Sequence, residues 1–330
     1  MDPSIFLALG EEAPVQAEYA RELLGDVVLR PDLGHDGKFF FPQANDPWYL
    51  APRAHAAVLD RPVYRAQRML FPMLAGGFGL FPPRIVVWAM LVTNLLALGL
   101  GSLLAARLAL LWGASPWLGL AVPLNIGLMF EFDIGGAGVV AYVFCLGGVH
   151  SLVTGREWAA AALLAGAVLS REVMLAFAIG VFVLYWVQGR RRSWWLVALP
   201  AVAVVAWNIY LRFRLAGITG LGGGREIFAA PFAGLWQAFP FWIDRVDYLL
   251  LNGTLLLVMV AFTLRAVRGR LPLAWGALPF VALASILSVH VWREPFDLAR
   301  ALAPVFTATA FVFFVPARDP PPVSGLEPPV

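Results

Sequence analysis

Apolar runs fill most of the chain from residue 84 onward, and short polar segments separate them. A helix needs about 20 mostly apolar residues to cross roughly 30 Å of hydrocarbon, and most of these runs approach that length. The pattern therefore predicts an all-helical chain with nine membrane spans. The spans cover residues 84–107, 116–131, 134–152, 158–170, 173–188, 194–211, 246–264, 272–291 and 298–316.

Residues 158–188 allow two interpretations, because the second, fourth and fifth runs are short for a full crossing. They could form one helix with Arg171 and Glu172 near its middle, or two helices that turn at 170–172. Arginine placement favours two helices, since the basic loops then share one side, which the positive-inside rule makes cytoplasmic. These loops carry Arg107, Arg156, Arg190, Arg191, Arg192, Arg265, Arg268, Arg270 and Arg318.

The other side then carries Asp36, Asp133, Glu172 and the segments 212–245 and 293–300. Nine spans with a cytoplasmic C-terminus place the N-terminus outside the cell. The apolar run 5–9 is too short for a signal peptide. We therefore expect a first transmembrane helix upstream of residue 1, unless the number of spans is off by one.

Three regions follow from this pattern. Residues 1–82 form an extracytoplasmic region, in which 53–82 mixes apolar and polar positions as amphipathic helix on a membrane surface does. Residues 83–316 form the transmembrane domain. Residues 317–330 are rich in proline and are expected to be a disordered cytoplasmic tail.

Composition agrees with a membrane protein. The 330 residues are 60% hydrophobic and 14% charged, with a mean hydropathy of +0.76, whereas soluble domains carry about 25% charged residues. The chain lacks a basic patch interleaved with polar surface residues, which argues against a nucleic-acid partner. The single cysteine, Cys145, excludes an internal disulfide and argues against a cysteine-ligated zinc site.

Charged residues and aromatics gather between residues 34 and 72, before the spans begin. Asp36 lies between His35 and Gly37, where its carboxylate could accept a proton from a hydroxyl or help to bind a metal. An Asx turn that bonds nearby backbone explains the same spacing and is favoured on spacing alone. Arg65 and Arg68 are three apart and share a helix face, which suits a phosphate or, equally, lipid head groups.

Further charged residues stand at the ends of spans. Glu131 and Asp133 end the second span, where they could point into a cavity or belong to a solvated turn, which is slightly favoured. Arg171 and Glu172 lie between two short apolar runs, and charges at such a depth usually mark function, although mutual pairing would neutralise them. Arg300 begins the last span, within a cluster with Arg293, Glu294 and Asp297 next to His290; snorkelling to the interface is its structural explanation. The four histidines lack metal-ligand spacing, so we assign no metal ligands.

Three segments resemble those of a group of bacterial multi-span proteins. Residues 34–41, GHDGKFFF, resemble the segment YDGQFYY. Residues 64–72, YRAQRMLFP, resemble YRYQRILYP, and residues 170–175, SREVML, resemble RETALL. The resemblance covers most of residues 30–316. By architecture and an acidic first outer loop, these proteins are similar to the GT-C superfamily of integral-membrane glycosyltransferases, which use polyprenyl-phosphate sugars.

The resemblance implies a fold with a first helix, an outer loop with surface helices and a key acidic residue, and many spans. Asp36 falls where the acidic residue is expected, as general base or metal ligand, so a divalent cation stays open as cofactor. The resemblance makes Arg65, Arg68 and Arg171 candidates to hold the lipid-linked phosphate. Glu172, which would orient Arg171, is counted with Asp36 as a candidate catalytic residue. We add His35, Lys38, Glu131, Asp133 and Arg300 as candidate substrate-binding residues.

The implied activity is transfer of a sugar from a polyprenyl-phosphate donor to an envelope acceptor, at the outer face of a bacterial inner membrane, with membrane lipids as further partners. The chain departs from the group's pattern at several positions: it has His35 for tyrosine, Lys38 for glutamine, and Phe40 and Phe41, which lack the tyrosine hydroxyls. A transporter or lipid flippase and a non-catalytic partner in envelope assembly are the alternatives. A transporter usually shows internal repeats, and none is visible here.

Overall fold

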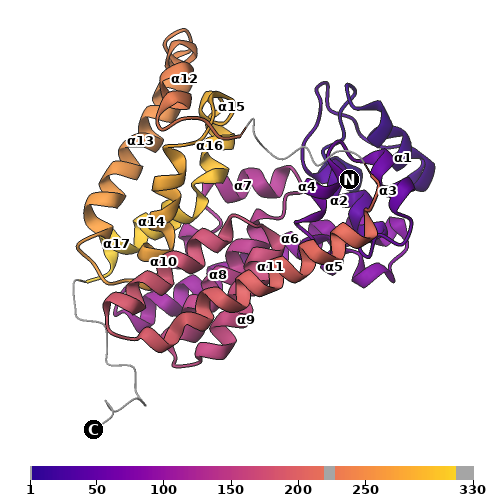
Figure 1. Ribbon diagram of the computed structural model, residues 1–330. Helices are drawn as coiled ribbons and strands as arrows, with labels where there is room; N and C mark the ends of the chain where they lie inside the picture. Colours follow the sequence, from indigo (N-terminus) through magenta and orange to yellow (C-terminus); the bar gives the residue numbers. More distant parts are fainter. Residues whose placement is uncertain (1, 219–226, 317–330) are drawn as a thin grey trace.

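The computed structural model describes residues 2–218 and 227–316, and helices dominate both ranges (Figure 1). Extended pairing among these residues is limited to three isolated β-bridges. The predicted all-helical class is therefore confirmed. The proline-rich tail predicted at 317–330 lies outside the described residues.

Short helices make up the region before residue 83, at the indigo and purple end of Figure 1. Proline occupies the first turn of several of them, where its missing N–H costs little and its fixed φ suits a helix. The amphipathic helix expected over 53–82 is divided into α3, α4, α5 and η2. The elements of this region are η1 (Pro3–Leu7), α1 (Pro14–Leu24), α2 (Gly37–Asn45), α3 (Pro52–Val58), α4 (Pro62–Ala66), α5 (Leu70–Ala75) and η2 (Gly77–Gly79).

Three helices are long and apolar enough to cross a membrane: α6 (Pro83–Leu111), α11 (Trp195–Arg214) and α13 (Val246–Ala266). Only 33%, 22% and 17% of the residues in the apolar windows of these three helices are buried inside the protein. Such exposed apolar faces are what lipid would cover. Two further helices, α16 (Pro295–Ala301) and α17 (Ala303–Phe314), pass the same test together but bend by 67° at their junction.

Four apolar helices are shorter, with 13 to 16 residues: α8 (Gly138–Val153), α9 (Glu157–Ser170), α10 (Met174–Val187) and α14 (Pro272–Ala284). Two helices, α9 and α10, cover the range 158–188, so the two-helix interpretation is confirmed. Gly155 and Gly189 follow α8 and α10 with positive φ, a backbone state that commonly ends helices. The short connecting elements are η3 (Pro116–Ala121), α7 (Ile126–Asp133), η4 (Arg191–Trp194), α12 (Ala233–Ile243) and α15 (Val289–Arg293).

Three predicted spans are broken in the structure, and one of them is 298–316, which bends where α16 meets α17. The range 116–131 is divided between η3 and α7, because the Asn125 side chain accepts the N–H groups of Gly127 and Leu128 and starts a new helix there. The range 272–291 is divided as well, since α14 ends at Ala284 and a β-bridge joins Leu287 to Phe228 before α15 begins.

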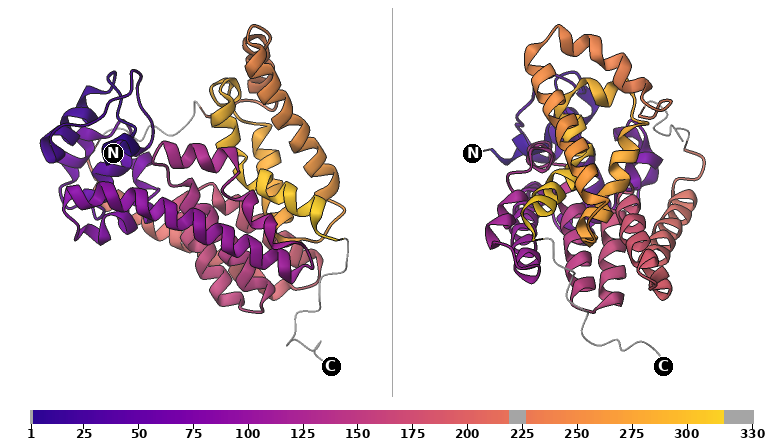
Figure 2. Two further views of the ribbon diagram at one scale, coloured as in Figure 1. Left: turned by 180° about the vertical axis from the view of Figure 1, so that it is seen from behind. Right: turned by 90° about the vertical axis from the view of Figure 1, so that its left-hand side faces the viewer.

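The core lies around α8, which is buried on most of its surface and packs against α6 and α9. Beyond it, α9 packs on α11, α10 packs on α14, and α14 packs on α17 (Figures 1 and 2). The N-terminal helices α2 and α5 pack on α6, and α16 packs on α7. These contacts bring the starts of α2 and α10, the ends of α7 and α16 and the segment around α4 toward one another.

Candidate functional site

Asp36 occupies the N-cap position of α2, but its side chain makes no capping bond there. Its two oxygens instead meet arginines from distant segments. Arg65 Nη1 donates to Oδ1 at 2.9 Å, Arg300 Nη2 donates to Oδ2, and Arg68 Nη1 lies 3.8 Å from Oδ2. The Asx-turn interpretation, which spacing alone favoured, is therefore wrong. Asp36 is the centre of a cluster of guanidinium groups.

The charge state of Asp36 follows from this environment. Burial by itself would raise the pKa of its carboxyl, but Arg300, Arg65 and Arg68 outweigh burial and hold the pKa well below its ordinary value. Asp36 is thus a carboxylate at any physiological pH. While the arginines stay on it, it is a weak proton acceptor, because a general base works best with a pKa near the operating pH.

Two further carboxylates, Glu131 and Glu172, pair with the arginines of this cluster. Glu131, whose side chain is 1% exposed, accepts from Arg300 Nε at 2.8 Å and from Arg171 Nη1. Its other oxygen accepts the Gly138 N–H at 3.0 Å. Glu172 accepts two parallel bonds of 3.0 Å from Arg68, the bidentate geometry that carboxylate and guanidinium favour.

Three sequence-based interpretations are corrected by these bonds. Arg171 and Glu172 do not neutralise each other, since Arg171 pairs with Glu131 and Glu172 pairs with Arg68. Glu172 accordingly orients Arg68 and not Arg171. The Arg300 side chain is only 13% exposed and is held by three carboxylates, so it does not snorkel to an interface.

Aromatic side chains fix two of the arginines in place. The Arg65 guanidinium lies 3.9 Å from the centre of the Phe39 ring, and its other nitrogens bond Asp60 at 2.9 and 3.0 Å. Arg68 Nη2 donates to the Tyr64 hydroxyl at 2.7 Å. Stacking and bidentate pairing suit the planar guanidinium and restrict its orientation. The two arginines predicted to share a face therefore reach Asp36 together.

The structure places the remaining predicted residues at the edge of this cluster or outside it. Asp133 is 58% exposed and pairs with Arg30 at 3.0 Å, so only Glu131 of that acidic pair joins the cluster. The Lys38 ammonium donates to the Leu33 carbonyl. His35 packs edge-on against Phe130, and burial lowers its pKa, which leaves the imidazole neutral at pH 7.

We define the arginine cluster as Asp36, Glu131 and Glu172 with Arg65, Arg68, Arg171 and Arg300. Its members carry four positive and three negative charges. The nearby acids Asp60 and Asp297 are more exposed, at 42% and 37%. Within the described part of the chain, Arg171 Nε is buried and has no hydrogen-bond partner. Because Asp60 and Asp297 also pair with Arg65 and Arg300, no positive charge is in excess. The unused buried donor is the feature that an anionic ligand such as a phosphate would satisfy.

Sequence reasoning missed several supporting residues. Asp60 bonds Arg65 and Tyr64 bonds Arg68. Each partner lies four or five residues before its arginine, a spacing from which the contact could have been predicted. Gly138 gave no such signal. A Cβ there would lie 2.5 Å from Glu131 Cδ and 2.7 Å from Arg171 Nη1, so only glycine leaves room for this ion pair.

Across residues 2–218 and 227–316, His, Cys, Asp and Glu side chains form no group of three or more that could hold a metal ion. Whether a divalent cation serves as cofactor stays open. Comparisons of the chain with known protein families, with curated proteins and with solved structures found no match.

Proposed function

We propose that this chain is an integral-membrane glycosyltransferase of the GT-C type, which transfers a sugar from a polyprenyl-phosphate donor to an envelope acceptor. The proposal includes nine spans and an active site at the outer face of a bacterial inner membrane. The observation that carries it is Asp36 between Arg65, Arg68 and Arg300, because a transferase of this kind needs a base and a phosphate-binding group at one place.

The donor phosphate would compete with Asp36 for these arginines. In the described conformation the guanidinium groups are occupied by the chain's own carboxylates. A phosphate that takes over bonds from Arg65 and Arg300 compensates the positive charge that holds the pKa of Asp36 low. Donor binding would thereby convert Asp36 from a weak proton acceptor into a useful base.

The transfer itself would be a single displacement. The acceptor oxygen attacks the anomeric carbon while its proton passes to Asp36 Oδ2 or Oδ1. The bond between that carbon and the phosphate oxygen breaks, and its electron pair leaves with the polyprenyl phosphate. Arg68 and Arg171 stabilise the developing phosphate charge, and Glu172 and Glu131 keep their guanidinium groups in position.

The test is sugar transfer in membranes that contain the expressed protein, with a panel of radiolabelled polyprenyl-phosphate sugars. Asp36→Asn keeps the shape of the side chain but cannot take the proton, so transfer should fall by about a hundredfold or more. Asp133→Asn is the matched control, since Asp133 lies outside the arginine cluster and is exposed. Its transfer should equal that of the wild type.

Two outcomes would count against the proposal. Transfer that survives Asp36→Asn removes this carboxylate from the mechanism. An absence of transfer by the wild type across the whole donor panel would favour a transporter, a flippase or a non-catalytic partner in envelope assembly.

A further inference from the structure

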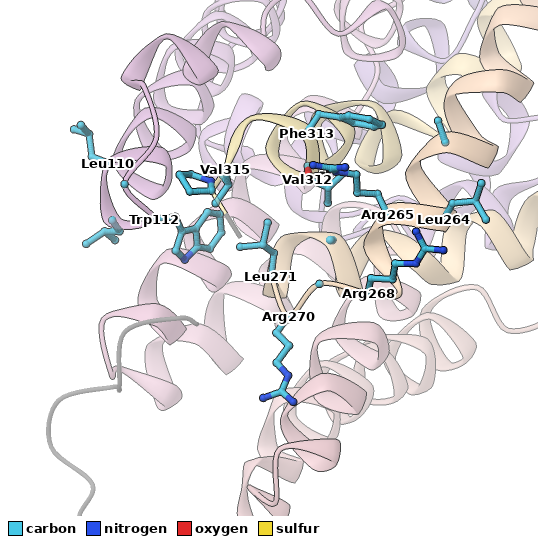
Figure 3. A pocket seen from close by; sticks show the side chains of 16 residues that line it. Leu110, Trp112, Leu264, Arg265, Arg268, Arg270, Leu271, Val312, Phe313 and Val315 are labelled. Carbon is cyan, nitrogen blue, oxygen red and sulfur yellow. Dashed lines mark hydrogen bonds between the residues drawn. The ribbon is translucent and has the colours of Figure 1, made fainter. Parts of the chain in front are cut away.

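A second cluster of arginines lines a cavity of about 1070 Å³ where α13 turns into α14 (Figure 3). Arg265, Arg268 and Arg270 contribute to its wall, together with apolar residues from the ends of α6 and α17. Helix α13 contacts α12 and α16, the helix that carries Arg300, and is 21 residues or about 32 Å long. The cavity lies at its C-terminal end, far from the arginine cluster around Asp36. It is a separate feature of the molecule.

The two sets of arginines differ in how their charge is compensated. Every guanidinium around Asp36 pairs with a carboxylate. Among the described residues, Arg265, Arg268 and Arg270 form no ion pair with any carboxylate. Three positive charges without a carboxylate partner in residues 2–218 and 227–316, beside one cavity, attract an anion.

One of these arginines is already positioned. Arg265 Nε donates to the Val312 carbonyl at 3.0 Å, and its guanidinium lies 5.1 Å from the centre of the Phe313 ring. Figure 3 shows its guanidinium group beside Val312 and Phe313, while the Arg268 side chain extends toward Leu264. A held guanidinium loses little further side-chain freedom when a phosphate binds.

The apolar part of the wall continues onto the outer surface. Leu110, Leu264 and Phe313 line the cavity and are 58%, 58% and 42% exposed. They lie in α6, α13 and α17, whose exposed faces are apolar along their length. A ligand that fits must therefore join an anionic head to hydrocarbon, as a membrane lipid does.

We propose that this cavity binds the head group of an anionic phospholipid from the leaflet at the arginine-rich end of the protein. The phosphate contacts Arg265 and Arg268, Arg270 adds its charge from the cavity wall, and the acyl chains extend along Leu264 and Phe313. Basic pockets between transmembrane helices bind anionic head groups in this way. The volume is slightly above that of typical ligand sites, which are about 300–1,000 Å³. This inference is independent of the transferase activity.

Native mass spectrometry of the full chain in detergent, titrated with dioleoylphosphatidylglycerol, tests the proposal. The variant Arg265→Gln/Arg268→Gln/Arg270→Gln should bind this lipid at least about tenfold more weakly than the wild type, because the attraction of three arginines is lost. Arg268→Gln/Arg270→Gln should show part of this loss. It poses less risk to folding, since neither side chain makes a hydrogen bond to another segment in the described part of the chain. Dioleoylphosphatidylcholine should bind the wild type at least about tenfold more weakly than the anionic lipid.

The matched control is Arg84→Gln/Arg156→Gln/Arg212→Gln, which removes the same charge from exposed positions outside the cavity. It should bind phosphatidylglycerol like the wild type. Equal losses in the control and in the cavity variant would overturn the proposal in favour of general surface attraction. Equal binding of the two lipids, or displacement of the lipid by equimolar sn-glycerol 3-phosphate, would overturn it in favour of an apolar groove or a soluble phosphate site.

Discussion

Glu131 is the carboxylate that lies deepest in the arginine cluster. It is 1% exposed, and it meets Arg171 and Arg300 while its second oxygen accepts the Gly138 N–H. Buried charges of this kind are tolerated only with partners, and removing one partner leaves the others uncompensated. Glu131 therefore matters for folding as much as for the position of the two arginines.

Glu131→Gln should lower the free energy of unfolding by about 3 kcal/mol, because two buried guanidinium groups lose their common counter-charge. Thermal unfolding of the purified protein in detergent measures the change. Asp133→Asn, two residues further along but exposed, should change stability by less than about 0.5 kcal/mol. Equal stability of both variants would mean that the ion pairs of Glu131 contribute no net stability.

His55 predicts a pH dependence in the N-terminal region. Its ring is 5% exposed and meets the Tyr49 ring at 4.3 Å, and burial lowers its pKa from 6.5 to about 4, against a small opposing effect of Asp46. Below pH 6.5 the unfolded chain binds a proton at this histidine that the folded protein does not bind until about pH 4. Stability from this group is therefore complete above pH 6.5 and is lost as the pH falls toward 4.

Lowering the pH from 7.5 to 5.0 should cost about 2 kcal/mol through His55 alone. His55→Phe keeps an aromatic ring but cannot titrate. Thermal unfolding should therefore show a free energy of unfolding whose pH dependence is smaller by that amount. A variant that melts with the same pH dependence as the wild type would show that the imidazole titrates normally.

The partners of Asp36 mark a limit of sequence reasoning at the residue scale. The residue type and its aromatic surroundings singled out Asp36, and the charged positions near Arg65, Arg171 and Arg300 were recognised one by one. Their pairing was not predictable, because Arg65 and Arg300 lie 29 and 264 residues away from Asp36 in the chain. Only the packing of α2, α4 and α16 decides which carboxylate meets which guanidinium.

At the scale of elements, apolar length predicted where helices occur better than where they break. The interruptions at 122–125 and 285–288 lie within apolar runs, so hydropathy does not reveal them. The first depends on a single capping side chain, Asn125, which also bonds the Ala303 carbonyl and Thr307 of α17. Such breaks follow from tertiary contacts, which outweigh the local pattern.

The contact between α7 and α16 supports the arginine cluster, because it brings Glu131 and Arg300 together. Gly127 makes it so close that a Cβ there would lie 2.2 Å from the Ala299 carbonyl oxygen. Gly127→Ala should therefore push α16 away from α7, destabilise the protein by about 1–3 kcal/mol and reduce transfer. Thermal unfolding and the transfer assay measure the two effects.

Gly99→Ala is the control for this helix-to-helix contact. Gly99 lies inside α6, and a Cβ there would meet no other atom within 4 Å. Alanine should be neutral or stabilise the helix by up to about 1 kcal/mol, because glycine is a poor helix former. If both alanine variants behaved alike, the close approach at Gly127 would not be what sets the position of α16.

At the scale of the whole molecule, charge is distributed unevenly between two ends. The arginine cluster and the exposed aromatic helix α12 belong to segments that the arginine pattern places outside the membrane. The cavity arginines and the turn after α8 belong to segments that the arginine pattern places on the cytoplasmic side of the membrane. This orientation is a prediction that the helical arrangement alone does not test, because length and composition identify spans without giving them a direction.

Labelling of single cysteines in intact bacterial cells with a membrane-impermeant maleimide tests the orientation. Cys145 is buried, so Cys145→Ala provides a background with little disturbance to the surface. In it, Leu33→Cys and Trp236→Cys, at positions that are 59% and 72% exposed, should react from outside. Thr154→Cys, in the exposed turn after α8, should react only after the cells are permeabilised. The opposite result would place Asp36 on the cytoplasmic side, where the positive-inside rule does not expect it. Any transfer reaction at this site would then also take place on the cytoplasmic side.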